Sequence, residues 1–98
     1  MAAYVIVDIH ITDPSTYETY KGKAASTVQA FGGRYIVRGG EVETLEGDWT
    51  PGRTVVLEFP DAQRAREWWS SQLYAPVKAI RHASSRTRMI LVEGAEGC

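Results

Sequence analysis

The sequence predicts an α+β, ferredoxin-like fold with the element order βαββαβ and a four-stranded antiparallel sheet. Two stripes of apolar residues at helical spacing alternate with four short segments rich in β-branched residues. Glycine or proline stands near most of the junctions between them. The chain has 98 residues, the length of one domain, so we expect a single domain over residues 1–98 with a loose tail at 94–98.

The first third of the chain predicts a strand followed by a helix. Residues 3–11 are rich in β-branched side chains and predict the first strand. Asp13 as N-cap and Pro14 at the first helical position predict where the helix starts, and Gly32 with Gly33 predicts where it ends. Residues at three- and four-residue spacing form its expected buried stripe: Tyr17, Tyr20, Ala24, Val28 and Phe31.

The middle of the chain predicts two further strands. Residues 34–38 predict the second strand, and residues 53–59 predict the third. Gly39 and Gly40 predict a bend between them rather than an end, so we expect the second strand to continue after the bend. The residues expected to continue it are Val42, Thr44 and Leu45.

The last third predicts a broken helix and a final strand. Pro60 and Asp61 open the helix, and Pro76 interrupts it because the residue before a proline is disfavoured in helical geometry. A shorter helix is expected to resume through Val77, Ile80 and Ala83, followed by a strand over residues 87–93. The expected buried face of the first segment consists of Ala65, Trp68, Trp69 and Leu73.

Composition excludes several classes of function. The formal net charge is −1, without the basic face of a nucleic-acid-binding protein, and no apolar run approaches the roughly 20 residues that cross a bilayer. The only cysteine is Cys98, which fits a cytoplasmic location. Motifs for nucleotide binding, zinc proteases and serine hydrolases are missing, so we predict no cofactor and no metal.

Strand alternation predicts a polar cluster on the sheet face that turns away from the helices. Asp8 and His10 share that face in the first strand, Arg38 in the second and Glu58 in the third. The first and third strands are central in this fold, so Arg38 is expected to lie beside Asp8 and Glu58. These four residues are our candidate catalytic residues; the alternative is a structural ion network.

The same sheet face predicts a homodimer. An open face carrying Tyr4, Ile6, Ile36 and Val56 would be adhesive, and a second copy would cover it. Trp49 lies among turn residues, and an exposed tryptophan there is typical of an interface anchor.

Aromatic residues predict a binding pocket between helices and sheet. The candidate substrate-binding residues are Tyr20, Trp69 and Tyr74, because buried phenols need polar partners and one of two adjacent tryptophans cannot fit fully into the core. Two further alternatives stay open. One is a metal site made from His10, Asp8 and Glu58, and the other is haem ligation by His82.

Four segments cover nearly the whole chain and resemble a known family: YVIVDIHITDPSTYETY, GGRYIVRGGEVETLEGDWTP, VVLEFPDAQRAREWW and LYAPVKAIR. They are similar to the bacterial domain-of-unknown-function 1330 family, and the second segment is the most specific. The resemblance implies a dimeric α+β barrel, the architecture of antibiotic-biosynthesis monooxygenases, muconolactone isomerases and chlorite dismutases. It implies no established reaction.

Two hypotheses of function follow. The first is a small cofactor-independent enzyme of the oxygenase, isomerase or lyase type, acting on a small oxygenated organic molecule. In it, Arg38 anchors an oxyanion, and Asp8, His10 or Glu58 moves protons. The alternative is a non-catalytic homodimer, either structural or binding a small molecule, in which the same charges only fix how the two copies pair.

Overall fold

The structure is a computed structural model that describes residues 1–95. Its four strands form one antiparallel sheet in the order β2-β3-β1-β4, which confirms the predicted ferredoxin-like α+β fold. The expected tail at 94–98 lies partly outside the described residues. In chain order the elements are β1 (Ala3–Ile11), α1 (Pro14–Ala30), β2 (Arg34–Arg38), β3 (Arg53–Phe59), α2 (Ala62–Trp69), α3 (Ala75–Ser84) and β4 (Ser85–Glu93).

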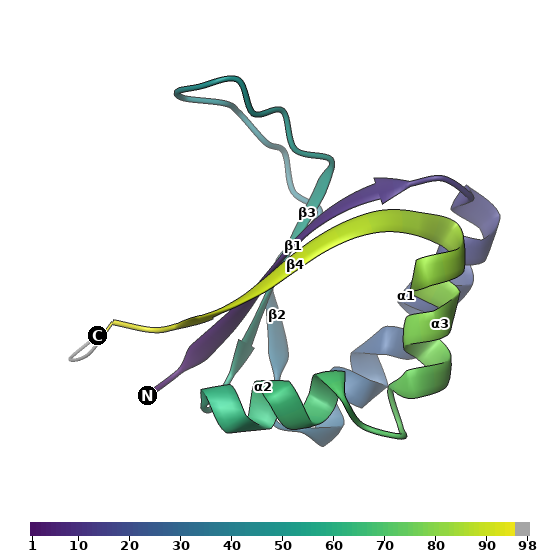
Figure 1. Ribbon diagram of the computed structural model, residues 1–98, viewed down its shortest axis with the longest axis vertical. Coiled ribbons are helices and arrows are strands. Elements are labelled where there is room, and N and C mark those ends of the chain that lie inside the picture. The colour runs from purple at the N-terminus through teal and green to yellow at the C-terminus, as the bar shows by residue number, and fades with distance from the viewer. Residues whose placement is uncertain (96–98) are drawn as a thin grey trace.

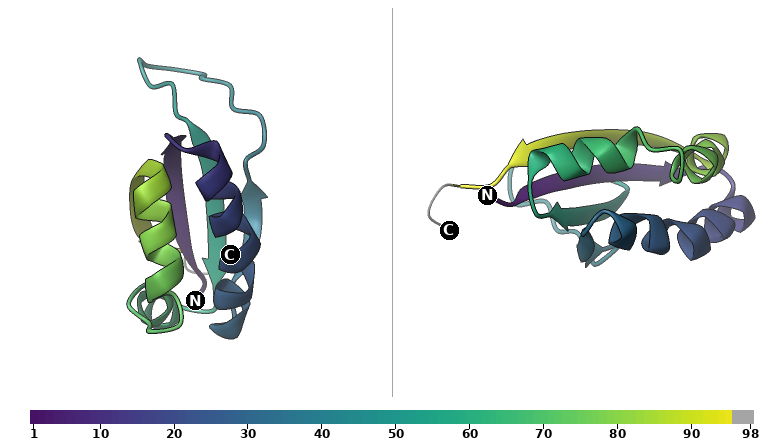
Figure 2. Two further views of the ribbon diagram at one scale, coloured as in Figure 1. Left: turned by 90° about the vertical axis from the view of Figure 1, so that its right-hand side faces the viewer. Right: turned by 90° about the horizontal axis from the view of Figure 1, so that it is seen from below.

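All three helices lie on the same side of the curved sheet (Figure 1). Figure 2 shows α1 and α3 side by side across that face. No helix formed by residues 1–95 lies over the opposite face of the sheet, and we call it the outer face. Within the described part of the chain, no helix is long and apolar enough to cross a membrane.

The ends of α1 follow the predicted signals. The Asp13 carboxylate accepts a hydrogen bond from the backbone N–H of Thr16, which caps the first turn. At the other end Gly32 has φ 78°, a conformation that other residues rarely adopt, and the Gly33 N–H donates to the carbonyl of Val28. The chain therefore leaves the helix and turns directly into β2.

The core lies between the helices and the sheet, with Trp68 at its centre. The Trp68 indole is 1% exposed, and its ring centre lies 4.2 Å from that of Tyr74 and 5.5 Å from that of Phe59. The prediction that Trp69 and Leu73 share this buried face is wrong, because they are 47% and 53% exposed. Successive helix residues are rotated by about 100°, so the core position of Trp68 turns Trp69 outward.

Residues 39–52 form a long loop that projects from one end of the sheet (Figure 1). The prediction that Val42, Thr44 and Leu45 continue β2 is wrong, since this loop has no regular secondary structure and Leu45 is 89% exposed. The final strand also begins two residues before the expected Thr87, at Ser85.

A β-bulge changes which way Arg38 points. Tyr35 pairs with Leu57 and Arg38 pairs with Val55, but the register shifts by one residue between Tyr35 and Val37. One inserted residue reverses the faces of all side chains that follow it. Arg38 therefore lies on the helix-covered face with Val55, and its predicted position on the outer face is wrong.

Candidate functional site

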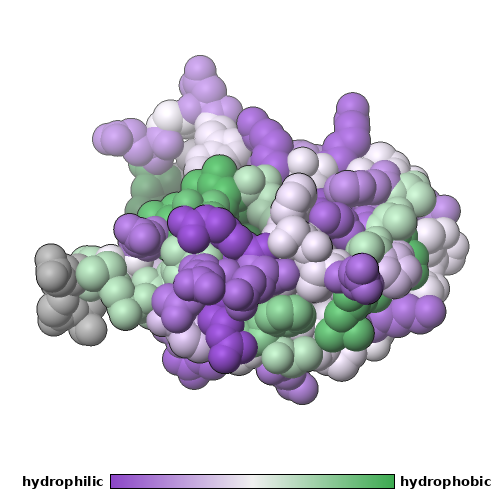
Figure 3. All heavy atoms as spheres, turned by 60° about the horizontal axis from the view of Figure 1, so that its bottom comes forward, coloured by the Kyte–Doolittle hydropathy of each residue, from purple (hydrophilic) through white to green (hydrophobic). Residues whose placement is uncertain are grey.

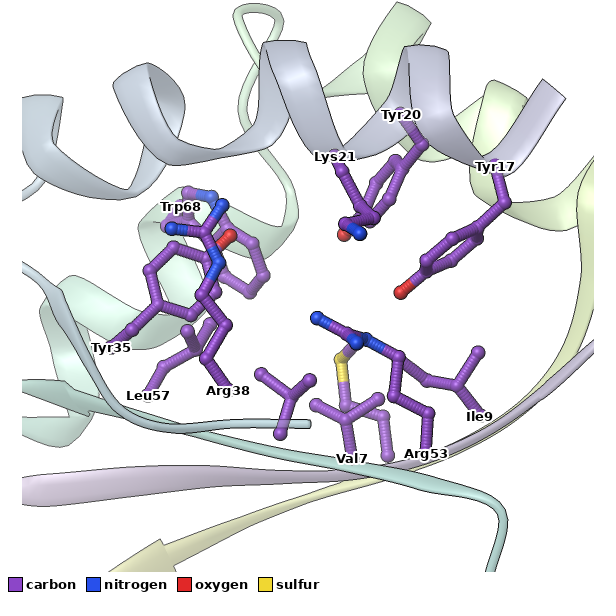
Figure 4. Close-up of a pocket in the computed structure, with 12 residues that line it drawn as sticks. Val7, Ile9, Tyr17, Tyr20, Lys21, Tyr35, Arg38, Arg53, Leu57 and Trp68 are labelled. Atoms are coloured by element: carbon purple, nitrogen blue, oxygen red, sulfur yellow. The ribbon is translucent and has the colours of Figure 1, made fainter. Parts of the chain in front are cut away.

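A small pocket lies between α1 and the helix-covered face of the sheet, and polar side chains enter it from both layers. We call it the α1–sheet pocket. Figure 4 shows Tyr17, Tyr20 and Lys21 pointing from α1 toward the sheet, where Arg38 and Arg53 lie. The other residues lining it are apolar or aromatic: Val7, Ile9, Tyr35, Val55, Leu57, Trp68 and Met89.

Three of the lining side chains are cations: Lys21, Arg38 and Arg53. The described residues that line the pocket include no carboxylate to balance them. The Arg38 guanidinium lies 4.2 Å from the centre of the Tyr35 ring, a cation–π contact that holds it at the pocket edge. Because cations close together repel one another, the pocket favours an anion or a polarised carbonyl oxygen.

Arg53 has an unused hydrogen-bond donor. Its Nε is buried and has no hydrogen-bond partner among the described residues. Gly39 has φ 73°, and any side chain at that position would collide with the Arg53 guanidinium, so this glycine makes room for it. An unsatisfied buried donor costs about 1–3 kcal/mol. A ligand oxygen that reached this N–H would remove that cost.

The phenols in the pocket stay protonated at neutral pH. Burial raises the pKa of Tyr17, Tyr20 and Tyr35 above the ordinary value of 10.0. For Tyr17, the positive charge of Arg53 and a hydrogen bond to it offset part of that rise in pKa. Neutral phenols donate hydrogen bonds, so they add donors to the cations and supply no base.

A buried hydrogen-bond chain supports the pocket from behind. The Tyr20 and Tyr74 hydroxyls lie 2.8 Å apart, and Arg81 Nε donates to the Tyr74 oxygen at 3.3 Å. The Trp68 Nε1 donates to Thr27 Oγ1 at 3.1 Å. Tyr20, one of the predicted binding residues, therefore lines the pocket, while Tyr74 is fully buried and orients it.

The enclosed space is small, with a cavity volume of about 20 Å³. Such a space holds roughly one water molecule. Tyr17 and Tyr20 are buried, whereas Arg38 is exposed and Lys21 is half-buried. These two long side chains stand at the pocket edge, so a larger ligand group enters only if they swing outward.

The predicted cluster of Asp8, Arg38 and Glu58 does not form within one protomer. Asp8 lies on the outer face, as predicted. Arg38 lies on the opposite face of the sheet, because the β2 bulge reverses the direction of its side chain. Glu58 pairs instead with Arg34, whose Nε donates to Glu58 Oε1 at 2.7 Å. This hydrogen bond to Arg34 is the main reason why the pKa of Glu58 lies below its ordinary value.

Asp8 has its own set of partners on the outer face. It is 8% exposed and accepts hydrogen bonds from the Gly52 N–H at 2.8 Å and from Arg88 at 3.1 Å. His10 Nε2 lies 3.6 Å from the same carboxylate. Over residues 1–95, no group of three or more histidine, cysteine or acidic side chains is arranged to hold a metal ion, which argues against the His10, Asp8 and Glu58 alternative.

Acid is expected to destabilise the fold through Asp8. Burial alone would raise the pKa of Asp8, but hydrogen bonds from Gly52, Arg88 and Trp49 outweigh it and hold the pKa below 3.8. A carboxyl group with a lowered folded-state pKa stabilises the fold above its unfolded pKa, and the benefit is lost as the pH falls through the folded value. We expect Asp8→Asn to lower Tm at about pH 7 and to differ less from the wild type at about pH 3.

The measurement is Tm by circular dichroism across that pH range. Glu93→Gln, at the end of β4, is the control and should run parallel to the wild type. A constant difference between Asp8→Asn and the wild type at every pH would show that the Asp8 charge is not responsible.

Two other predicted residues lie elsewhere. Trp69 lines a separate groove beside β4, together with His82. Of the three residues predicted to bind substrate, Tyr20 lines the α1–sheet pocket and Tyr74 is buried behind it. Trp69, the tryptophan outside the core, borders a groove, as expected for one of the two tryptophans, but not the groove that contains Tyr20.

Sequence reasoning missed Arg53, the residue that best defines the pocket. The alternation that turns Val55 and Leu57 toward the helices also turns Arg53 there, so the signal was present in the strand pattern. Lys21 follows Tyr17 by one helical turn, which places both on one face of α1. The position of Arg38 depended on a bulge that side-chain periodicity does not reveal.

The fold and the pocket together define a ferredoxin-like α+β protein with a cationic site between one helix and the sheet. The chain belongs to the DUF1330 family, described as a domain of unknown function, which it matches over residues 2–95. This confirms the resemblance noted from the four sequence segments. A search of curated proteins finds no match to the chain.

Several solved structures are similar in fold. A protein of unknown function from Rhodopseudomonas palustris, RPA0582, is 15% identical with a TM-score of 0.79, over 97% of this chain and 83% of that one. SnoaB, a cofactor-independent oxygenase from Streptomyces nogalater, is 14% identical with a TM-score of 0.63, over 97% of this chain and 94% of SnoaB. A dimeric protein of unknown function with a ferredoxin-like fold, from Bacteroides fragilis, is 13% identical with a TM-score of 0.59, over 95% of this chain and 96% of that one.

Proposed function

We propose that the protein is a small cofactor-independent enzyme that holds the oxyanion of a small oxygenated organic molecule in the α1–sheet pocket. The observation that carries this is the convergence of Lys21, Arg38 and Arg53 on one space. Among the described residues, no carboxylate lines that space and Arg53 Nε has no hydrogen-bond partner. Guanidinium groups and neutral phenols are suited to a carboxylate or an enolate, because both bind through charge-assisted hydrogen bonds.

The roles differ among the residues. Arg38 keeps its proposed role as oxyanion anchor, and Arg53 is a second anchor deeper in the pocket. Tyr17 and Tyr20 donate hydrogen bonds from α1. The described lining residues supply donors but no carboxylate or imidazole base, so the pocket supports best a reaction in which the substrate reaches its enolate readily. The similarity in fold to SnoaB, a cofactor-independent oxygenase, supports the choice of this reaction type.

Binding of acetoacetate tests the proposal, because this molecule carries both a carboxylate and an enolisable ketone. We expect calorimetry to show tighter binding of acetoacetate than of its neutral isostere, acetoacetamide. Arg38→Met should weaken acetoacetate binding by about ten- to a hundredfold, since a hydrogen bond to a charged group contributes about 1.5–3 kcal/mol. Arg64→Met, at an exposed position of α2 that does not line the pocket, is the matched control.

Deuterium exchange at C2 of acetoacetate, followed by proton NMR, separates catalysis from binding. Stabilisation of an enolate should accelerate exchange in the wild type and not in Arg38→Met. Equal affinity for acetoacetate and acetoacetamide would contradict the proposed site. Binding without accelerated exchange would instead favour the alternative hypothesis, a protein that binds a small molecule without transforming it.

We also infer that two copies pair through the outer face of the sheet. Ile90 and Val92 on that face are 58% and 40% exposed, and a hollow of about 570 Å³ lies between this face and Trp49 of the loop. Figure 3 is seen from the helix side, and hydrophobic surface (green) there reaches the rim of the molecule next to the projecting loop. Asp8, His10 and Glu58 lie on the same face, so we assign these candidate residues to the interface with a second copy. A cytoplasmic location remains a prediction from the lone Cys98.

Trp49→Ala is expected to weaken the dimer. Trp49 is 59% exposed at the edge of the outer-face hollow, and buried tryptophans are frequent anchors of protein interfaces. Native mass spectrometry at low micromolar concentration should show more monomer for Trp49→Ala than for the wild type. Trp69→Ala removes a similarly exposed tryptophan away from this face and should leave the distribution unchanged.

A further inference from the structure

A second hollow lies on the helix-covered side of the sheet, between α2, α3 and the edge strand β4. We call it the β4 groove. Its volume is about 560 Å³, within the range of roughly 300–1,000 Å³ that is typical of sites for small organic ligands. Leu91 points toward the helices yet is 36% exposed, so the helices leave this part of β4 uncovered.

The walls of the groove are apolar, and one of them is an indole ring with a cation against it. The apolar lining includes Trp69, Met89 and Leu91. Lys78 Nζ lies 3.7 Å from the centre of the Trp69 ring and also donates to the Trp69 carbonyl at 2.8 Å. The hydrogen bond to the carbonyl holds the Lys78 ammonium over the ring, and the cation–π contact favours this position of the exposed indole beside the groove. A planar apolar ligand would therefore pack against an aromatic ring that already borders the groove.

The polar part of the groove is cationic. Arg66, Arg81 and His82 line it, and no acidic side chain occurs among its described lining residues. Arg81 is 3% exposed, and its hydrogen-bond partners are the neutral Tyr74 hydroxyl at 3.3 Å and His82 Nε2 at 3.4 Å. Within residues 1–95, Arg81 forms no salt bridge. A buried guanidinium without a counter-ion is costly, and an incoming anion would compensate it.

We propose that the β4 groove is a second ligand site, which takes an aromatic carboxylate. Its carboxylate lies at Arg81, within reach of Arg66 and His82, and its ring lies against Trp69 and Leu91. The site is separate from the α1–sheet pocket: the two share only Trp68 and Met89 in their linings, and none of their cations. The proposal therefore does not rest on the proposed function.

Calorimetric titration with 2-naphthoate tests the site, with 2-naphthamide as the neutral control of the same shape. We expect naphthoate to bind at least about tenfold more tightly than naphthamide, as one charge-assisted hydrogen bond provides. Arg66→Gln, on the exposed rim, should weaken naphthoate binding several-fold without disturbing the core. Arg81→Met should abolish the preference for naphthoate, provided that circular dichroism shows it to be folded.

Two further variants separate this site from the rest of the molecule. Arg64→Gln changes an exposed arginine of α2 that does not line the groove, and Arg53→Met changes the α1–sheet pocket; both should bind naphthoate like the wild type. Three results would overturn the proposal: equal affinity for naphthoate and naphthamide, unchanged binding in Arg66→Gln, or loss of binding in Arg53→Met. Binding that disappears as protein concentration rises would also overturn it, because a second copy would then cover the groove.

Discussion

Replacing Trp68 with alanine is expected to destabilise the fold by about 3–5 kcal/mol, as found for large-to-small changes of buried aromatic residues. The side chain is 1% exposed and lies between the rings of Phe59 and Tyr74. Its Nε1 donates a hydrogen bond to the Thr27 hydroxyl. The total free energy of unfolding of a domain is about 5–15 kcal/mol. Tm should therefore fall by more than about 12 °C, measured by circular dichroism or calorimetry.

The adjacent tryptophan provides the matched control. Trp69 is 47% exposed, and its interaction with Lys78 is of the kind that contributes about 0.5–1 kcal/mol at exposed sites. Trp69→Ala should therefore lower Tm by only a few degrees. Equal effects of the two variants would contradict the structure, because the stability of the core would then not depend on which tryptophan is buried.

This pair also shows how far the sequence could predict the fold. Helical spacing indicated that the two tryptophans could not both be fully buried, but spacing alone did not decide which one enters the core. That decision depends on the length of α2, which ends at Trp69, and on the contacts of Trp68 with Phe59 and Tyr74 from other elements. Long-range packing of this kind leaves no local signal.

The site was less predictable than the fold for a related reason. Element order and strand faces follow from local periodicity, which is why β1 and β3 have the predicted bounds and α1 has the predicted start. The position of Arg38 follows from a one-residue irregularity in the pairing of β2 with β3. A bulge is set by the strand's neighbour, so alternation within the strand predicted the opposite face.

Arg53→Met is expected to increase stability and to abolish oxyanion binding. The methionine side chain keeps much of the volume of arginine, and it removes a buried Nε that lacks a partner. An unsatisfied buried donor costs about 1–3 kcal/mol, but the variant also loses the hydrogen bond between Arg53 and Tyr17, which offsets part of the gain. We therefore expect the free energy of unfolding of the variant to exceed that of the wild type by about 1 kcal/mol. Tm should rise by about 4–8 °C.

The binding side of this prediction separates a functional charge from a structural one. Acetoacetate should raise the Tm of the wild type and leave that of Arg53→Met unchanged, because ligand binding stabilises only the state that binds. Arg64→Met should behave like the wild type in both respects, since exposed substitutions change stability by less than about 0.5 kcal/mol. If Arg53→Met lowers Tm instead, the guanidinium holds the fold together. A buried charge at a binding site lowers the stability of the protein without ligand and raises that of the complex. In this protein Arg53 would then reduce the free energy of unfolding in exchange for ligand binding.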